Sequence, residues 1–276
     1  MSFLDRLSTG WELAKISFDT INKNRSLLLF PVFSVISLVL VLVTFAGGSF
    51  FLFGDEIRAM ADNEQFGNAL SIGAIFLYYL INFFIIVFFN SALIYCAVKV
   101  LNGEETTLGD GISFANARIG KIFGWAVLSA TVGTLMQLLQ NNGKIGQIVA
   151  GIFGVAWSIL TFFVVPVLIF EDKGVIDTVK ESGRLMKQKW GESLAANVSF
   201  GVFHFLGIIA AFVIGWLLST IDPVLGIVVG ILVVLLVSTI IATAQTIFVA
   251  AVYNRVTGAP IGNFNGDTLD SVFIQK

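Results

Sequence analysis

Six long apolar blocks dominate the hydrophobic pattern of this chain, and polar residues gather between them. The blocks cover residues 26–53, 69–101, 120–140, 145–170, 193–221 and 224–253. Each reaches the ~20 residues that an α-helix needs to cross a ~30 Å hydrocarbon core. Membrane barrels instead use ~10-residue stretches of alternating polarity. The pattern therefore predicts an all-α, polytopic integral membrane protein with six transmembrane helices.

The composition favours lipid as the solvent of this chain. Hydrophobic residues make up 57% of its 276 residues and charged residues only 12%, against roughly 25% in soluble domains. The net charge of −2 offers no basic excess for a nucleic-acid partner. The first block lacks a small-residue cleavage site, so we expect a retained helix rather than a signal peptide. We expect one membrane domain over residues 1–276 that ends in a polar cytoplasmic tail at 255–276.

The basic residues separate the two sides of the predicted membrane domain. Of the 16 lysines and arginines, all but Arg58 and Lys144 fall in the N-terminal segment, the second and fourth loops with their adjoining block ends, and the tail. Lysine and arginine accumulate on the cytoplasmic side of membrane proteins. The distribution therefore predicts that both termini are cytoplasmic.

Three polar segments, ahead of the first, third and fifth blocks, share a helical pattern. Mostly apolar residues recur at i, i+3, i+7 and i+10 in each: Trp11, Ala14, Phe18 and Ile21; Ile112, Ala115, Ile119 and Ile122; Ile176, Val179, Gly183 and Met186. This spacing places a stripe on one helix face. We expect an amphipathic cytoplasmic elbow helix at each position. The three helix-plus-hairpin units are either copies of one repeat or three loops that became amphipathic independently.

Two prolines lie close to the predicted cytoplasmic ends of apolar blocks. They are Pro31 in the first block and Pro166 in the fourth. Proline removes a backbone donor and bends the helix at its position. We expect both to direct the chain between a membrane helix and an elbow helix.

Several motifs resemble a family of prokaryotic membrane proteins of unknown function. They are Phe162-Phe163-Val164-Val165-Pro166-Val167-Leu168, Glu171-Asp172, Glu181-Ser182 through Trp190-Gly191, Gly109-Asp110-Gly111, and Trp11 with Leu27-Leu28-Leu29-Phe30-Pro31. The resemblance covers nearly the whole chain and implies a six-helix fold in the cytoplasmic (inner) membrane, with no assigned activity. More distantly, the layout is similar to the membrane domain of some glycerophosphodiester phosphodiesterases. Their catalytic domain has no counterpart here.

Few polar side chains lie within the apolar blocks. His204 is the ionisable group nearest the middle of a block, and Asn82, Asn90 and Asn197 are amides that also fall within the blocks. Such groups mark ion or solute pathways in many membrane proteins. They could line a polar path together. Alternatively, His204 is a neutral packing residue and the amides form interhelical hydrogen bonds, worth roughly 0.6–2 kcal/mol per pair.

Small residues give two of the blocks a face that another helix can approach closely. Gly226 and Gly230 form a GxxxG in the sixth block, and Gly151 and Gly154 lie in the fourth. Such faces pack helices within a chain or between chains. The partners we expect are membrane lipids and a homo-oligomer or other membrane proteins.

Motifs of enzyme chemistry are lacking from the sequence. It has no HExxH, P-loop, dinucleotide-binding or GxSxG pattern, and one cysteine, Cys96. We expect no enzyme, no cofactor and no metal site. The first hypothesis is a non-enzymatic module that assembles in the membrane or acts on the bilayer. The second is a channel or carrier for a small solute, and the third, resting on the distant resemblance, is a lipid-directed enzyme.

Overall fold

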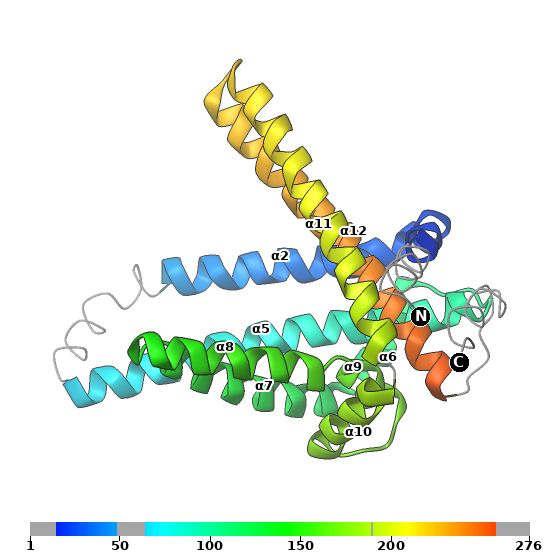
Figure 1. The fold of residues 1–276 in the computed structure, drawn as a ribbon, viewed down its shortest axis with the longest axis horizontal. Coiled ribbons are helices and arrows are strands. Elements are labelled where there is room, and N and C mark those ends of the chain that lie inside the picture. Colours follow the sequence, from blue (N-terminus) through cyan, green and yellow to red (C-terminus); the bar gives the residue numbers. More distant parts are fainter. Residues whose placement is uncertain (1–14, 49–63, 189, 258–276) are drawn as a thin grey trace. The chain divides into compact units, whose positions relative to one another are not determined.

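The computed structural model describes residues 15–48, 64–188 and 190–257, which form helices and no strand. Residues 15–23 are helical and precede the elements labelled in Figure 1. The elements after residue 23 are η1 (Arg25–Leu28), α2 (Leu29–Val43), the π-helical η2 (Thr44–Gly48), α5 (Glu64–Leu101), α6 (Leu108–Asn116), α7 (Ile119–Gln140), α8 (Gly143–Leu160), α9 (Val164–Phe170), α10 (Val175–Gln188), α11 (Trp190–Ser219) and α12 (Pro223–Thr257), of which Figure 1 labels the α-helices.

Six stretches of helix within the described residues are long and apolar enough to cross a membrane. They are Arg25–Val43, Ser71–Leu101, Ile119–Gln140, Gly143–Leu160, Phe200–Ser219 and Pro223–Asn254. The prediction of an all-α chain with six such helices is confirmed. Together they suggest a multi-pass membrane protein, because ~18 or more uncharged apolar residues match the thickness of a bilayer core.

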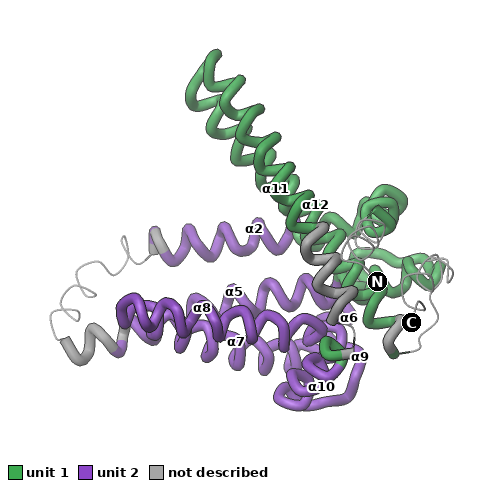
Figure 2. The backbone as a smooth tube through the Cα atoms, viewed as in Figure 1, with its two compact units in different colours: residues 1–31, 93–111, 185–276 green, residues 32–92, 112–184 purple. Residues whose placement is uncertain are grey.

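The chain forms two compact units built from interleaved segments. Unit 1 contains residues 1–31, 93–111 and 185–276, and unit 2 contains residues 32–92 and 112–184. Figure 2 colours the two units separately. Helix α5 contributes to both, because its residues before 93 belong to unit 2 and the later ones to unit 1. The prediction of a single membrane domain stays a prediction.

Aromatic side chains hold the long helices of unit 2 together. Phe45 on η2 and Phe33 on α2 contact Tyr78 and Phe89 on α5, with ring centroids 5.6 and 6.3 Å apart. The order of these contacts makes the two helices antiparallel. The α7–α8 hairpin is joined by stacked rings of Trp125 and Trp157, 5.9 Å apart. Offset aromatic pairs of this kind contribute about 0.5–1.5 kcal/mol beyond the burial of their area.

The fourth apolar block forms two helices where the sequence predicts one span. Helix α8 ends at Leu160, and the short α9 begins at Val164. Between them the backbone N–H of Phe163 donates to the Ser182 hydroxyl at 3.0 Å. Pro166 explains the break, since its ring would clash with the carbonyl of residue 162 in a continuous helix. In the first turn of a new helix, its missing N–H costs no hydrogen bond.

The first apolar block also differs from its predicted extent. Helix α2 ends at Val43, and the helix continues only as the π-helical turn Thr44–Gly48. Residues 49–53 of that block lie outside the described residues. Pro31 lies in the first turn of α2, where the backbone N–H of residue 31 would have no helical partner.

The predicted elbow helices are not confirmed. The stripe of the second one is divided, because Ala117 and Arg118 interrupt the helix between α6 and α7. In α10 the buried residues include Thr178 and Ser182, whereas Ile176 of the predicted stripe is 56% exposed. Met186 of that stripe is buried, so the buried face and the predicted stripe overlap only in part. Trp11 and Ala14 of the first stripe lie outside the described residues, as do the tail residues after 257.

Unit 1 packs around the α11–α12 hairpin. Phe200 and Phe203 on α11 contact Phe18 of the N-terminal helix, with centroids 6.3 and 5.2 Å apart, and Phe200 also contacts Phe248 on α12. The last third of α12 is the most buried part of this unit, with Ala244, Ile247, Ala250 and Ala251 at most 1% exposed. Small residues there allow close approach of neighbouring backbone.

Candidate functional site

The α11–α12 hairpin is joined near its turn by glycine. A Cβ on Gly226 would lie 2.5 Å from the carbonyl oxygen of Gly215, and a Cβ on Gly215 would lie 3.3 Å from the Cα of Gly230. The two backbones therefore touch without intervening side chains. The turn is capped by Asp222, whose carboxylate accepts the N–H of Leu225 at 2.8 Å, and Pro223 occupies the first position of α12.

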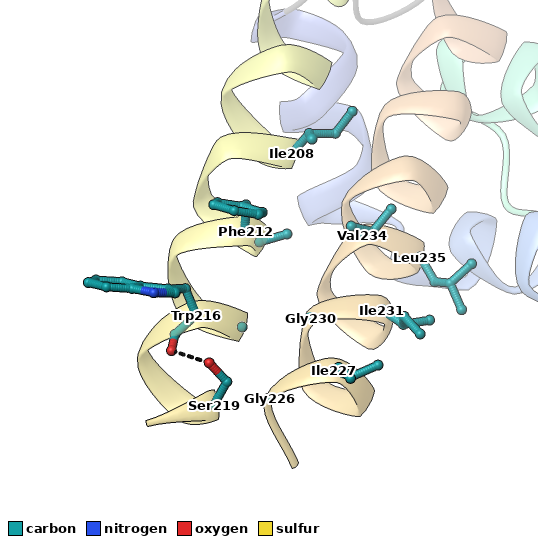
Figure 3. Close-up of a pocket in the computed structure, with 12 residues that line it drawn as sticks. Ile208, Phe212, Trp216, Ser219, Gly226, Ile227, Gly230, Ile231, Val234 and Leu235 are labelled. Atoms are coloured by element: carbon teal, nitrogen blue, oxygen red, sulfur yellow. Dashed lines mark hydrogen bonds between the residues drawn. The ribbon is translucent and has the colours of Figure 1, made fainter. Parts of the chain in front are cut away.

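A groove runs beside this glycine contact (Figure 3), and we call it the hairpin groove. Its volume is about 500 Å³, within the range of small-molecule sites. It is lined by Ile208, Ala211, Phe212, Gly215, Trp216, Ser219, Gly226, Ile227, Gly230, Ile231, Val234 and Leu235. Ser219 supplies the one side-chain hydroxyl of that lining, and it donates to the Trp216 carbonyl at 2.7 Å. The groove therefore offers mainly apolar contact, and the indole N–H of Trp216 is a further side-chain donor in its lining.

His204 lies deeper in the same hairpin. Its Nε2 is 3.0 Å from the Oγ of Ser238, which makes a hydrogen bond between α11 and α12. Gly207, one turn further on α11, lies against Val237, so the helices remain close at this depth. In lipid such a bond satisfies two polar groups at once. The side chain of Asn197 lies outside the described residues.

Two of the four predicted path residues belong to unit 2 and the other two to unit 1. Asn82 donates its amide to the carbonyl of Tyr78 at 2.6 Å, one helical turn away. Asn90 is half-buried on the same helix. Since Asn197 and His204 belong to unit 1, a shared polar path stays a prediction.

The remaining predicted packing glycines lie on α8. Gly154 faces the methyl group of Met136 on α7, 3.2 Å from the position of an added Cβ. Gly151 has no atom within 4 Å of that position, so nothing in the described chain occupies its face. The two members of this pair therefore have different surroundings.

A polar cluster that sequence reasoning missed joins α6 and α7 to the segment after α8, and we call it the α9–α10 junction. Arg118 donates its Nε to the carbonyl of Ile169 at 2.7 Å, and its guanidinium lies 3.5 Å from the centre of the Phe114 ring. Lys121 donates to the Glu171 carbonyl at 3.0 Å. Both cations thus cap the C-terminal carbonyls of α9, where the helix dipole favours positive charge.

Ion pairs extend the junction along α10. Lys173 contacts Glu171 at 2.7 Å and Glu181 at 3.0 Å, and Arg184 also bonds Glu181. The hydrogen bond from Arg184 lowers the pKa of Glu181, and that from Lys173 lowers it further against the opposing effect of desolvation. The hydrogen bond to Glu171 and then that to Glu181 raise the pKa of Lys173. The charged forms are therefore the stable ones at neutral pH.

No group of three or more His, Cys, Asp and Glu side chains placed to hold a metal ion occurs within residues 15–48, 64–188 and 190–257. The contacts described above instead join helices in two places, the α11–α12 hairpin and the α9–α10 junction. One is built on glycine contact with a single polar pair, and the other on caps and ion pairs.

The model of the family of unknown function DUF6159 matches residues 69–262, so the chain belongs to that family. No curated protein and no solved structure matches the chain. The resemblance to a family of unknown function is thereby confirmed. The distant similarity to the membrane domain of glycerophosphodiester phosphodiesterases stays a prediction.

Proposed function

We propose that this DUF6159 member is a non-enzymatic module of the prokaryotic cytoplasmic membrane that associates through its membrane helices with itself or with other membrane proteins. One observation carries the proposal, which is the apolar surface that the α11–α12 hairpin leaves uncovered. On α12, Ile227, Ile231, Leu232 and Leu236 are each more than half exposed. In a membrane such a surface contacts lipid or packs against another helix.

The hairpin groove makes one side of this surface suited to a helix or to lipid tails. Its walls carry Phe212 and Trp216, which are 75% and 61% exposed. In membranes, helices associate by van der Waals packing of shape-matched surfaces rather than by apolar burial alone. A recess between two bulky aromatic residues and a glycine contact supplies such a shape.

The junction residues support a structural rather than a catalytic role. Arg118 and Lys121 donate hydrogen bonds to backbone carbonyls at the end of α9, and Lys121 also bonds Asp172. Lys173 forms ion pairs with two carboxylates. Side chains that are bonded in this way hold the helices in position. We therefore include the absence of enzymatic activity in the proposal.

The proposed orientation places the α9–α10 junction and both termini in the cytoplasm. The lysines and arginines outside the six apolar helices support it, because they gather on that side. Helix α10 would then lie at the membrane surface as an elbow. Ile176, Lys180 and Lys187 lie within about 40° of one another on its exposed face. Ile176 would contact lipid there, and the lysine stems would extend to bring their ammonium groups to water. Reporter tags at the two ends test this orientation, and tags in opposite compartments would contradict it.

The oligomeric state in a bilayer tests the proposed association. We would reconstitute the chain into nanodiscs and liposomes, and count subunits by photobleaching over a range of protein-to-lipid ratios. We expect oligomers whose population rises with density and falls for Ile231→Trp, which fills the hairpin groove. The matched control is Ile152→Trp on α8, another exposed isoleucine outside the groove. A monomer at every density that also copurifies with no membrane protein would overturn the proposal.

A further inference from the structure

A second cavity lies between α5 and α7, within unit 2. It is lined by Ala74, Ile75, Tyr78, Tyr79 and Gln137, and its volume is about 350 Å³. We call it the Tyr–Gln pocket. Unlike the hairpin groove, it has three side chains with polar atoms, and its wall residue Ala74 is exposed. A molecule outside the protein can therefore reach it.

The shape of the Tyr–Gln pocket depends on Gly133 of α7. A Cβ there would lie 3.5 Å from the Tyr79 ring and 3.3 Å from that of Phe83, so the glycine lets both rings pack on the α7 backbone. Phe45 contacts the Tyr78 ring edge to face, with the ring centroids 5.6 Å apart. The aromatic walls are thus fixed by their neighbours rather than by an occupant of the pocket.

The polar atoms of the pocket are not fully used by the protein. The Tyr79 hydroxyl donates to Oε1 of Gln137 at 3.4 Å, a long hydrogen bond. Within the described part of the chain, the Gln137 amide nitrogen and the Tyr78 hydroxyl have no partner. One turn before Gln137 on α7, the buried Thr134 hydroxyl also lacks one. Unpaired donors are costly in a membrane, where no water replaces the missing acceptor.

The depth of the pocket indicates which acceptor is available. Gln137 lies three residues before the end of α7 at Gln140, or about 5 Å along the axis. Tyr78 lies seven residues inside the apolar stretch that begins at Ser71, or about 10 Å. Tyrosine is enriched at this level, where an aromatic ring meets both acyl chains and polar groups. Ester carbonyls of glycerolipids are the abundant acceptors there.

We propose that the Tyr–Gln pocket binds the glycerol-ester neck of a membrane lipid. An ester carbonyl accepts the Gln137 amide N–H and the Tyr78 hydroxyl, while the attached acyl chain runs along Ala74 and Ile75. The inference rests on the membrane insertion of α5 and α7 assumed in the proposed function. The carbonyl of an isoprenoid quinone offers the same chemistry from a second source, so the experiment includes both.

Lipid retention measured by native mass spectrometry tests the proposal. The full chain is assembled in nanodiscs of diester or diether phosphatidylglycerol, each with an isoprenoid quinone added. The protein is released into the gas phase, and the lipids and quinones that stay bound are counted. We expect diester lipid to be retained by the wild type. The diether lipid lacks the carbonyl that accepts both hydrogen bonds, so it should be retained at least about five-fold less, which is the effect of losing one of them. Gln137→Leu should lower diester retention by a similar factor, and Tyr78→Phe should lower it in the same direction.

The control is Gln140→Leu, the same substitution one turn further on α7 at an exposed position outside the pocket. It should retain lipid as the wild type does. Equal retention of both lipids, or equal retention by the wild type and Gln137→Leu, would show annular lipid only and overturn the site. Quinone retained in place of diester lipid would overturn the lipid assignment. Failure to enter nanodiscs at all would instead contradict the proposed function.

Discussion

The α11–α12 hairpin and the α9–α10 junction join helices by opposite means. The hairpin brings backbones together by omitting side chains at Gly215, Gly226 and Gly230, and adds one polar pair, His204 with Ser238. The junction joins its segments with long cationic side chains that reach carbonyls and carboxylates. The first arrangement depends on shape and works in lipid. The second depends on charge and belongs where water screens it. Each should therefore fail under a different perturbation.

Adding one methyl group at the hairpin contact should have the largest effect. In Gly226→Ala, the new Cβ would meet the Gly215 carbonyl, a backbone atom that cannot rotate away. We expect the free energy of unfolding to fall by about 2–3 kcal/mol through overpacking. Thermal unfolding in detergent measures it. Gly201→Ala, on α11 with open space around its Cα, serves as the control and should be neutral. Equal stability of the two variants would contradict the glycine contact.

Removing Arg118 should be the most damaging single change at the junction. Arg118→Ala leaves the Ile169 carbonyl without its side-chain donor and removes the cation from the Phe114 ring. The expected loss is about 1–2 kcal/mol, the cost of an orphaned buried acceptor. Chemical denaturation measures it, with Lys187→Ala at an exposed α10 position as the control. If Arg118→Ala lowers the free energy of unfolding no more than Lys187→Ala does, Arg118 does not stabilise the junction.

The polar pair of the hairpin should contribute less. A double-mutant cycle with His204→Ala and Ser238→Ala isolates the energy of the Nε2–Oγ hydrogen bond from the loss of packing. Interhelical hydrogen bonds in membranes average about 0.6 kcal/mol, so we expect a coupling energy of that size. No coupling would indicate that the two side chains do not bond in the bilayer. A solute-flux assay on the same variants then tests the polar-path hypothesis directly.

The smallest expected effect is the pH dependence of the junction. The pKa of Glu181 is lowered in the folded chain, so the unfolded chain binds a proton at higher pH than the folded one does. The stabilisation is therefore present above the ordinary glutamate pKa of about 4.3 and is lost as pH falls through the lower folded value. We expect roughly a few tenths of a kcal/mol, because the ion pair with Arg184 faces water. Unfolding of the wild type and Glu181→Gln between neutral and acidic pH measures it. An identical pH profile for both would contradict the role of Glu181.

The sequence predicts the six apolar helices because length and lack of charge suffice to define a membrane helix. The short turn at Asp222 and Pro223 follows from the same pattern together with local capping chemistry. The break before Pro166 was predicted only as a bend, since the Ser182 hydroxyl that receives the freed Phe163 N–H lies 19 residues away in sequence.

The sites were less predictable because they depend on helix rotation. His204 is conspicuous in the sequence, but its partner Ser238 lies 34 residues away and is one of several hydroxyls on α12. The Tyr–Gln pocket was missed because it requires Gly133 to face Tyr79 rather than lipid. The predicted stripe of α10 matches its buried face only in part, because Met186 is buried together with the hydroxyls Thr178 and Ser182 while Ile176 is exposed.

The interleaving of the two units constrains the order in which the protein can be made. Unit 2 is complete once the ribosome has passed residue 184, whereas unit 1 joins the first helix to the last one. The ring contact between Phe18 and Phe200 cannot form until Phe200 has been synthesised, about 180 residues later. Until then the early segment of unit 1 lacks its packing partners from α11 and α12. A chain truncated after α10 would never supply them. Biogenesis of this protein therefore depends on late, long-range closure between the two ends of the polypeptide.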